Sequence, residues 1–423
     1  MNTARKGIIG KISLVLLAVG PGLFMIGYNI GTGSITTMAS AGSRYGMGLF
    51  WTLVLSCVFT FVMLVAYSRY TLVTGETSMM AYKKHLPFGK TVAVYTIIVL
   101  TIGELASLAG ITGIVADLVR EWSRILFGGE GFNLLGITTV IVGGCFYLLW
   151  VGKYSRFEKF LTFLVMIMGG SFILSLFIVV PDPGDLVSGL LPRIPKGPNA
   201  FIIIAGMAGT TCSAMVFIMR SIVVAEKGWT VDNLRQETID SFVSVTMMLL
   251  LSGAVMACAA GTLYKIGIPV ERAVDMVKTL EPLAGRFAIS IFVTGVIGAG
   301  VSTLFPIALV LPWLICDYTG RERNIGSPMF RILAGFGLLL GFTVPLFGGR
   351  PVWVMIISNA FQTTILPIVT LAVIYLVNNR NLMGEHRAGR WLNIGLWATF
   401  VFSLVTTYIG ILGFIESLSN IAG

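Results

Sequence analysis

Long apolar runs separated by short polar loops recur along the whole chain of 423 residues. A helix needs about 20 apolar residues to cross the hydrocarbon core of a bilayer. The pattern therefore predicts an all-α integral membrane protein with eleven transmembrane helices in one transmembrane domain, residues 1–423. The predicted spans are Ile12–Met38, Leu49–Val73, Val92–Asp117, Asn133–Val151, Phe160–Val180, Ala200–Ala225, Phe242–Tyr264, Ala288–Cys316, Ile332–Phe347, Val352–Val377 and Trp391–Ile415.

The composition agrees with a chain that lies in lipid. Hydrophobic residues make up 56% and charged residues 11%, whereas a soluble domain carries roughly 25% charged residues. Isolated charges are costly in the hydrocarbon core, so only a membrane protein avoids them over such a length. The net charge of +10 is spread over short loops, so we expect a lipid bilayer as partner and no nucleic acid.

Residue types that perform catalysis are scarce. The only histidines, His85 and His386, lie in polar loops, and no HExxH, GxSxG, GxGxxG or P-loop motif occurs. The cysteines lack CxxC spacing and fall in apolar segments, which indicates buried small side chains and not disulfides or zinc ligands. We therefore expect no enzyme activity and no cofactor. The five cysteines are Cys57, Cys145, Cys212, Cys258 and Cys316.

The loops predict an orientation. Most of the 29 Lys and Arg fall on one side of the predicted spans, and the basic side of a membrane protein is cytoplasmic. We expect a multi-pass protein of a bacterial cell membrane with a cytoplasmic N-terminus and an outside C-terminus. In the outer loop Pro269–Pro282, apolar residues at helical spacing predict a short surface helix.

Two spans are interrupted near their middle by glycine and hydroxyl residues. These segments are Gly31–Ser34 in the first span and Gly209–Ser213 in the sixth, five spans later. Matched interruptions in two halves indicate an inverted-repeat transporter whose substrate site lies at the breaks. The repeats would cover about residues 12–180 and 200–377, with an extra helix at about 391–415. The alternative is that these small residues only allow close helix packing.

Several short stretches along the chain carry a family resemblance. They are Gly20-Pro21-Gly22-Leu23-Phe24, Ala41-Gly42, Tyr45-Gly46, Trp51, Thr74-Gly75-Glu76, Leu280-Glu281-Pro282-Leu283, Ala299-Gly300-Val301-Ser302-Thr303, Leu366-Pro367 and Asn378-Asn379-Arg380-Asn381-Leu382-Met383-Gly384. Together they resemble the Nramp (natural resistance-associated macrophage protein) family of metal-ion transporters. The resemblance covers essentially the whole chain and implies the LeuT-like fold, with two inverted repeats of five helices and broken helices 1 and 6.

The chain departs from the family at the positions that bind metal. Where the family has Asp-Pro-Gly-Asn in span one, this sequence has Gly31–Ser34. Where the family has Met-Pro-His in span six, this sequence has Ser213, Ala214 and Met215. The resemblance therefore implies a diverged branch without the usual metal ligands, and the identity of any metal ligand stays open.

The proton path of the family is also altered. The family carries an Asp and a Glu seven and ten residues after a glutamate in span three. If Glu104 is that glutamate, the two positions here are Ile111 and Ile114. In span six, Met215 and Arg220 stand where relatives carry histidines, so the proton route of the relatives is expected to be absent.

We expect a substrate site at the two breaks, with Glu104 as the candidate for coupling or, alternatively, a structural carboxylate. Asn359 and Gln362, one turn apart in span ten, either line the site or bridge helices. Arg220 is interpreted as a snorkelling anchor rather than a ligand, and Cys212 as a packing residue; Tyr28 and Asn29 cap or line the first break. The predicted substrate-binding residues are Gly31, Thr32, Ser34, Thr211, Ser213, Met215, Asn359 and Gln362.

Neutral hydroxyls and carbonyls do not compensate a bare Mn²⁺ or Fe²⁺ for its lost water. We therefore predict a secondary-active carrier, acting as a monomer, for a metal that stays hydrated, as Mg²⁺ tends to, or that is chelated. The alternative is a carrier of a small organic solute. An ion channel is less favoured because no selectivity-filter motif is present.

Overall fold

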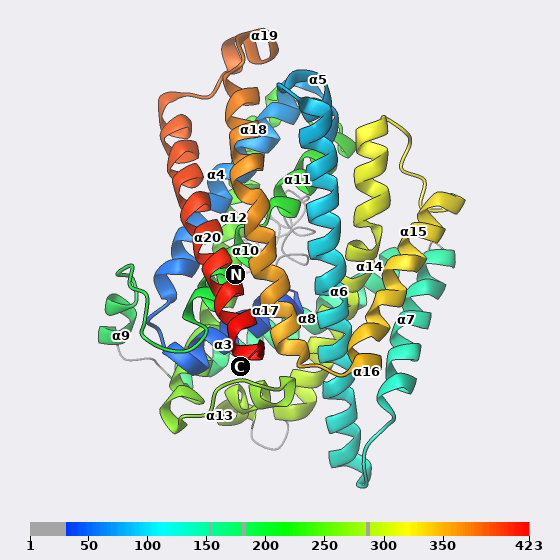
Figure 1. The fold of residues 1–423 in the computed structure, drawn as a ribbon, viewed down its shortest axis with the longest axis vertical. Helices are drawn as coiled ribbons and strands as arrows, with labels where there is room; N and C mark the ends of the chain where they lie inside the picture. The colour runs from blue at the N-terminus through cyan, green and yellow to red at the C-terminus, as the bar shows by residue number, and fades with distance from the viewer. Residues whose placement is uncertain (1–30, 152–153, 180–182, 285–287, 423) are drawn as a thin grey trace, which may run out of the picture.

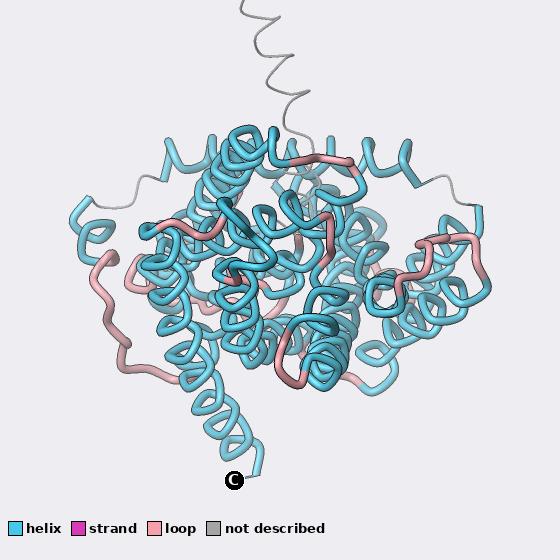
Figure 2. The backbone as a smooth tube through the Cα atoms, turned by 90° about the horizontal axis from the view of Figure 1, so that it is seen from above, coloured by secondary structure: helices cyan, strands magenta, loops and turns pink. Residues whose placement is uncertain are grey.

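The computed structural model describes residues 31–151, 154–179, 183–284 and 288–422, and all regular structure among them is helical (Figure 2). The N-terminal part of the predicted first span, with Tyr28 and Asn29, lies outside these residues. The α-helices are α3 (Thr32–Tyr45), α4 (Phe50–Thr74), α5 (Ser78–His85), α6 (Gly89–Phe127), α7 (Leu134–Val151), α8 (Tyr154–Val179), α9 (Pro183–Ser188), α10 (Ala200–Thr211), α11 (Ala214–Glu226), α12 (Leu234–Gly261), α13 (Glu281–Ala284), α14 (Ala288–Thr319), α15 (Pro328–Leu339), α16 (Thr343–Phe347), α17 (Pro351–Gln362), α18 (Leu366–Asn378), α19 (Arg380–Met383) and α20 (Arg390–Ala422).

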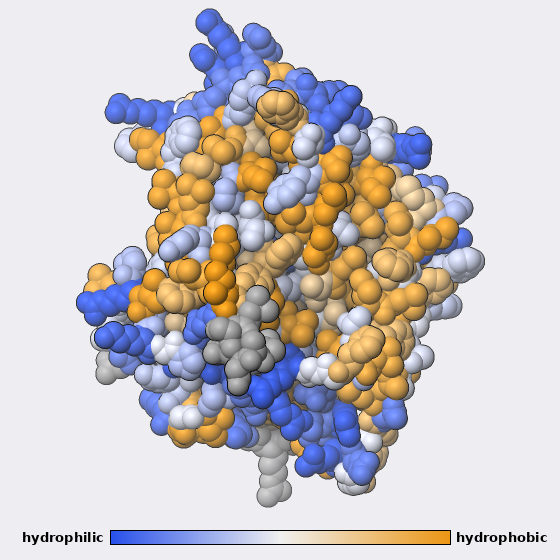
Figure 3. Space-filling view, in the orientation of Figure 1, coloured by the Kyte–Doolittle hydropathy of each residue, from blue (hydrophilic) through white to orange (hydrophobic). Residues whose placement is uncertain are grey.

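Within the described ranges, nine helical segments are long and apolar enough to cross a membrane. One of them joins α10 to α11, and another joins α17 to α18. Figure 3 shows the corresponding surface, in which an apolar band separates polar residues at the two ends of the molecule. The all-α transmembrane fold is thus confirmed, while the count of eleven spans stays a prediction because the first span is only partly described.

The segment α10–α11 forms the centre of the bundle. In its most apolar window 89% of the residues are buried, the highest share among the nine segments. Helix α10 packs against α17, α3 and α20, while α6 packs against α14 and α17. The contact with α17 requires glycine at position 209, because a Cβ there would lie 1.8 Å from the Asn359 carbonyl oxygen.

Short helices mark the two ends of the bundle (Figure 1). Helices α5 and α19 lie at one end, and α13 lies at the other. The helix predicted in Pro269–Pro282 is present as the 3₁₀-helix η3 (Ala273–Thr279), followed by α13. Ala273 and Met276 of η3 and the following Leu280 are buried, so the apolar face of this segment packs inward against the bundle.

Candidate functional site

The interruption of the sixth span is a true break in the helix. Helix α10 ends at Thr211 and α11 begins at Ala214, and Ser213 between them is extended, with φ −83° and ψ 127°. The carbonyl oxygen of Thr211, freed by the break, accepts a hydrogen bond of 2.9 Å from Thr60 Oγ1 of α4. A hydroxyl on a neighbouring helix therefore satisfies backbone that would otherwise be unpaired inside the membrane.

The described helix of the first span begins beside the same cavity. Gly31 is extended, with φ −78° and ψ 179°, and α3 starts at Thr32. Its carbonyl accepts bonds from Ser34 and Ile35 backbone N–H groups at 3.1 and 3.3 Å. The start of α3 and the break between α10 and α11 thus line one cavity. Thr32 to Ser34 are helical rather than unwound, and a break in the first span stays a prediction because the residues before Gly31 lie outside the described part of the chain.

The space inside the cavity that the centres of water molecules can occupy is about 40 Å³. This is room for a few water molecules. Its lining combines small residues with hydroxyls and amides, and Glu104 is the one carboxylate among the described lining residues. The start of α3 and the break between α10 and α11 contribute to it, together with α6, α14 and α17. The lining residues are Gly31, Gly33, Ser34, Glu104, Ser107, Ile111, Gly209, Thr210, Ser213, Thr303, Ile307, Met355, Asn359 and Gln362.

A chain of hydrogen bonds fixes the polar wall. Ser213 Oγ donates to Gln362 Oε1 at 3.2 Å, and Gln362 Nε2 donates to Ser107 Oγ at 3.3 Å. On the other side, Ser34 Oγ lies 3.0 Å from Ser252 Oγ, and Asn359 Nδ2 donates to Thr37 Oγ1 at 3.1 Å. These bonds fix the orientation of polar side chains that line the cavity.

The structure brings six of the nine predicted residues together in the lining. They are Gly31, Ser34, Glu104, Ser213, Asn359 and Gln362. Thr32, Thr211 and Met215 are buried but lie outside the lining. The Thr32 side chain instead faces Gly300 of α14. A Cβ added at Gly300 would lie only 3.4 Å from Thr32 Oγ1.

Residues that the sequence analysis missed carry a spacing signal in retrospect. Ser107 follows Glu104 by three residues, and Met355 precedes Asn359 by four. Residues three or four apart share one face of a helix, so each predicted residue indicates these neighbours. Thr303, which also lines the cavity, lies in a stretch of family resemblance but has no such partner.

The side chains present do not form a conventional metal centre. No group of three or more His, Cys, Asp or Glu suited to a metal ion occurs in the described residues. Ile111 lines the cavity, and Ile114 and Met215 are fully buried, so the positions at which the family resemblance implies proton-transfer groups carry no titratable side chain. The site can offer an ion one carboxylate and many neutral dipoles.

Arg220 does not snorkel to the membrane surface, so that interpretation is wrong. Its side chain is fully buried and lies 3.0 Å from Glu237 and 2.7 Å from Asp240, both on α12. Arg220 Nε also donates to Ser68 Oγ of α4 at 3.1 Å. A buried arginine needs such partners, and this cluster joins α11 to α12 and α4.

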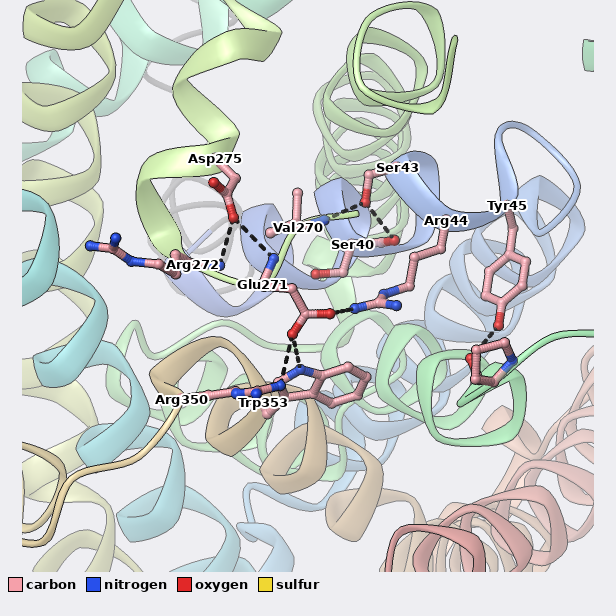
Figure 4. A network of polar contacts seen from close by, with 11 residues as sticks. Ser40, Ser43, Arg44, Tyr45, Val270, Glu271, Arg272, Asp275, Arg350 and Trp353 are labelled. Carbon is pink, nitrogen blue, oxygen red and sulfur yellow. Dashed lines mark hydrogen bonds and ion pairs between the residues drawn. The ribbon is translucent and has the colours of Figure 1, made fainter. Parts of the chain in front are cut away.

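A polar network closes the bundle at the end that carries η3 (Figure 4). Glu271 is paired with Arg44 of α3, and it also contacts Arg350 and the Trp353 indole of α17, each at 3.1 Å. Burial raises the pKa of Glu271, but the hydrogen bonds from Trp353 and Arg44 outweigh it and leave the pKa below its usual value. The charged carboxylate therefore links α3 to α17 at neutral pH.

Hydrogen bonds also close the end that carries α5. Asp317 of α14 accepts bonds from the Thr77 hydroxyl and, at 3.0 Å, from the Met79 backbone N–H. Ser78 Oγ donates to Ser221 Oγ of α11 at 2.7 Å. Helix α5 thus bridges α11 and α14, and the cavity lies between two linked ends.

The sequence of this chain is similar to a known protein family and to transporters from several bacteria. The model of the family described as "Natural resistance-associated macrophage protein-like" matches residues 22–413. The "Divalent metal cation transporter MntH" of Mycobacterium leprae is 24% identical, covering 89% of this chain and 86% of the relative. That of Aeromonas hydrophila is 26% identical, covering 89% and 90%.

Solved structures share the fold at low identity. The manganese transporter of Eremococcus coleocola, in complex with an aromatic bis-isothiourea substituted compound, superposes with a TM-score of 0.74 at 13% identity, covering 96% of this chain and 87% of that chain. Mhp1, a nucleobase-cation-symport-1 family transporter, gives 0.57 at 15% identity over 94% and 90%. The LeuT-like fold is therefore shared, and with a family match over nearly its whole length the chain belongs to the Nramp family.

Proposed function

We propose that this protein is a secondary-active carrier for a divalent cation that keeps its water shell, with Mg²⁺ as the ion of matching chemistry. The relatives from Mycobacterium leprae and Aeromonas hydrophila are named divalent metal cation transporters, which supports a metal substrate. The cavity volume supports the hydrated form. The 40 Å³ is the space open to the centres of water molecules. As a sphere it would have a radius of about 2.1 Å, close to the distance from Mg²⁺ to the oxygen atoms of its bound waters.

The chemistry of the lining favours the same ion. Five hydroxyls, from Ser34, Ser107, Thr210, Ser213 and Thr303, accept hydrogen bonds from metal-bound water. Helix α10 ends at the cavity, and its last carbonyl groups add acceptors. None of these groups replaces a lost water ligand with a charge, so a cation gains most by remaining hydrated.

Glu104 supplies the charge in this proposal. Its side chain is buried and lines the cavity, where it attracts a cation through the water shell. Hydrogen bonds to a charged group are worth about 1.5–3 kcal/mol, so we expect Glu104→Gln to weaken Mg²⁺ binding roughly 10- to 150-fold. The alternatives, a chelated metal or a small organic solute, gain no support from a water-centre volume of about 40 Å³.

The test is uptake into proteoliposomes that contain a Mg²⁺ indicator. We expect saturable uptake that falls in Glu104→Gln but not in the control Glu226→Gln, because Glu226 is exposed and pairs with Arg323 away from the cavity. Hexaamminecobalt(III), which cannot lose its six ligands and resembles hydrated Mg²⁺ in size, should compete. Mn²⁺ that binds at least tenfold more tightly than Mg²⁺ would contradict outer-shell recognition.

The proposal includes the topology predicted from sequence. Repeats at about 12–180 and 200–377 would rock against each other around the cavity, with the helix at about 391–415 outside them. The N-terminus would be cytoplasmic and the C-terminus outside, in a bacterial cell membrane, and the monomer would be the working unit. Labelling of cysteines introduced at exposed loop positions on either end, in intact cells, tests the orientation.

A further inference from the structure

A groove far from the cavity lies between the end of α18 and the start of α20. It lies at the end of the bundle that carries α5 and α19 (Figure 1). Its volume is about 580 Å³, within the range of small-molecule sites. The residues that line it are Ile374, Tyr375, Asn378, Asn379, Asn393 and Trp397.

The groove has a fixed polar floor. The amides of Asn378 and Asn393 donate to each other at 2.7 and 2.9 Å. Asn393 Nδ2 also donates to the Ala388 carbonyl at 3.0 Å, which holds the loop before α20 against the floor. Tyr375 and Trp397 are 43% and 51% exposed, as expected for aromatic residues at the boundary between lipid and water.

Three exposed arginines, Arg380, Arg387 and Arg390, lie close in sequence to the residues that line the groove. Arg390, Asn393 and Trp397 recur at intervals of three and four residues, so they share one face of α20. Arg380 directly follows Asn379, and Arg387 precedes Ala388, whose backbone N–H donates to the Val377 carbonyl at 3.0 Å. None of the three arginines makes an ion pair with a residue that the structure describes.

The charges in this region are unbalanced. Between residues 374 and 400, Glu385 is the only carboxylate against three arginines. Basic side chains next to the end of a transmembrane helix attract anionic lipid, and the indole and phenol rings fit the headgroup depth. We propose that this groove binds the headgroup of an anionic phospholipid, with its phosphate near Arg387 and Arg390 and its glycerol against the asparagine amides.

The experiment uses the full-length protein purified in detergent. Thermal unfolding is recorded with phosphatidylglycerol and with phosphatidylcholine of identical acyl chains. We expect a larger rise in melting temperature with phosphatidylglycerol, since a ligand stabilises the state that it binds. Each arginine near a membrane surface contributes roughly a fivefold change in affinity, so Arg387→Gln with Arg390→Gln should shift the lipid titration roughly thirtyfold. Arg321→Gln, an exposed arginine in the α14–α15 loop, is the control and should leave the titration unchanged.

Labelling with a photoreactive phosphatidylglycerol then locates the site, and the modified peptides should fall within residues 374–397. Equal stabilisation by both lipids would overturn the proposal, as would an equal loss in the Arg321→Gln control. Inorganic phosphate that reproduces the stabilisation would show a free anion site and would also overturn it. Because the groove is separate from the cavity, each of these results is independent of Mg²⁺ uptake.

Discussion

Introducing the carboxylate that the family resemblance implies at position 31 should fail unless a second residue is changed. A Cβ added at Gly31 would lie 2.7 Å from Thr303 Oγ1 and 3.2 Å from Thr303 Cγ2. Thr303 is held in place because its hydroxyl donates to the Ala299 carbonyl at 2.6 Å and its side chain is buried. Thr303 therefore leaves room for glycine at position 31 but not for aspartate.

The size of the effect follows from the contact. Overpacking of a buried site costs about 1–3 kcal/mol, so Gly31→Asp should lower stability by at least this amount. Thr303→Ala removes both clashing atoms and should cost less on its own. Since the two residues touch, their effects should not add, and a coupling of about 0.5–3 kcal/mol is expected between them.

The assay compares the native protein, both single variants and the double variant by thermal unfolding and by calorimetry with Mn²⁺ and Mg²⁺. We expect Gly31→Asp to unfold at the lowest temperature and the double variant to recover most of the loss. With an Asp at position 31 beside Glu104, the double variant should bind Mn²⁺ at least tenfold more tightly than the native protein, which corresponds to about 1.4 kcal/mol.

Two results would refute this reasoning. Native-like stability of Gly31→Asp alone would show that Thr303 does not exclude a side chain at position 31. A stable double variant without any gain in Mn²⁺ affinity would show that the cavity is not where the ion binds.

Three further predictions test other parts of the structure. Ser213→Met removes the hydroxyl that donates to Gln362 and fills the cavity, so Mg²⁺ uptake should be lost while the melting temperature stays within a few degrees; unchanged uptake would place the substrate elsewhere. Glu271 has a lowered pKa, so its link between α3 and α17 is fully present above a pH of about 4.3 and is lost as the pH falls through the lowered pKa. The melting temperature of Glu271→Gln should therefore lie below that of the native protein at pH 7, and the two should converge in acid. A difference that stays constant with pH would contradict this role of Glu271. Arg220→Leu leaves Glu237 and Asp240 buried without their cation and should cost about 3–5 kcal/mol, measured by thermal unfolding, whereas wild-type stability would show that the carboxylates are neutral without it.

The break in the sixth span could be predicted because its signal is local. Glycine weakens a helix, and Thr and Ser satisfy freed backbone groups, so the segment Gly209–Ser213 marks the break, which occurs at Cys212 and Ser213. Asn359 and Gln362 could be predicted as lining residues because polar side chains are costly in a transmembrane helix unless they serve a site. Each of these inferences needs only a few adjacent residues.

Tertiary partners could not be predicted in the same way. The partners of Arg220 lie 17 and 20 residues further on, at Glu237 and Asp240 on the next helix, and sequence does not show which faces of α11 and α12 meet. The same holds for Thr303, whose role depends on the approach of α14 to Gly31. Rotation about the axis of each helix, which packing decides, is the missing information.

The lining residues also constrain how transport is coupled to an ion gradient. Ile111 and Met215 carry no exchangeable proton, and Arg220 stays protonated at any ordinary pH, so we expect the proton route that the family resemblance implies to be closed at these positions. Glu104 is the one carboxylate among the described lining residues, and a protonated Glu104 is neutral and no longer attracts a cation. A proton and a divalent cation therefore compete for one group, which allows exchange of the two across the membrane but not their movement together. Luminal pH recorded during Mg²⁺ uptake into proteoliposomes should stay constant or rise, and any rise should vanish in Glu104→Gln. Acidification of the lumen in step with uptake, persisting in Glu104→Gln, would require a proton path that avoids the cavity.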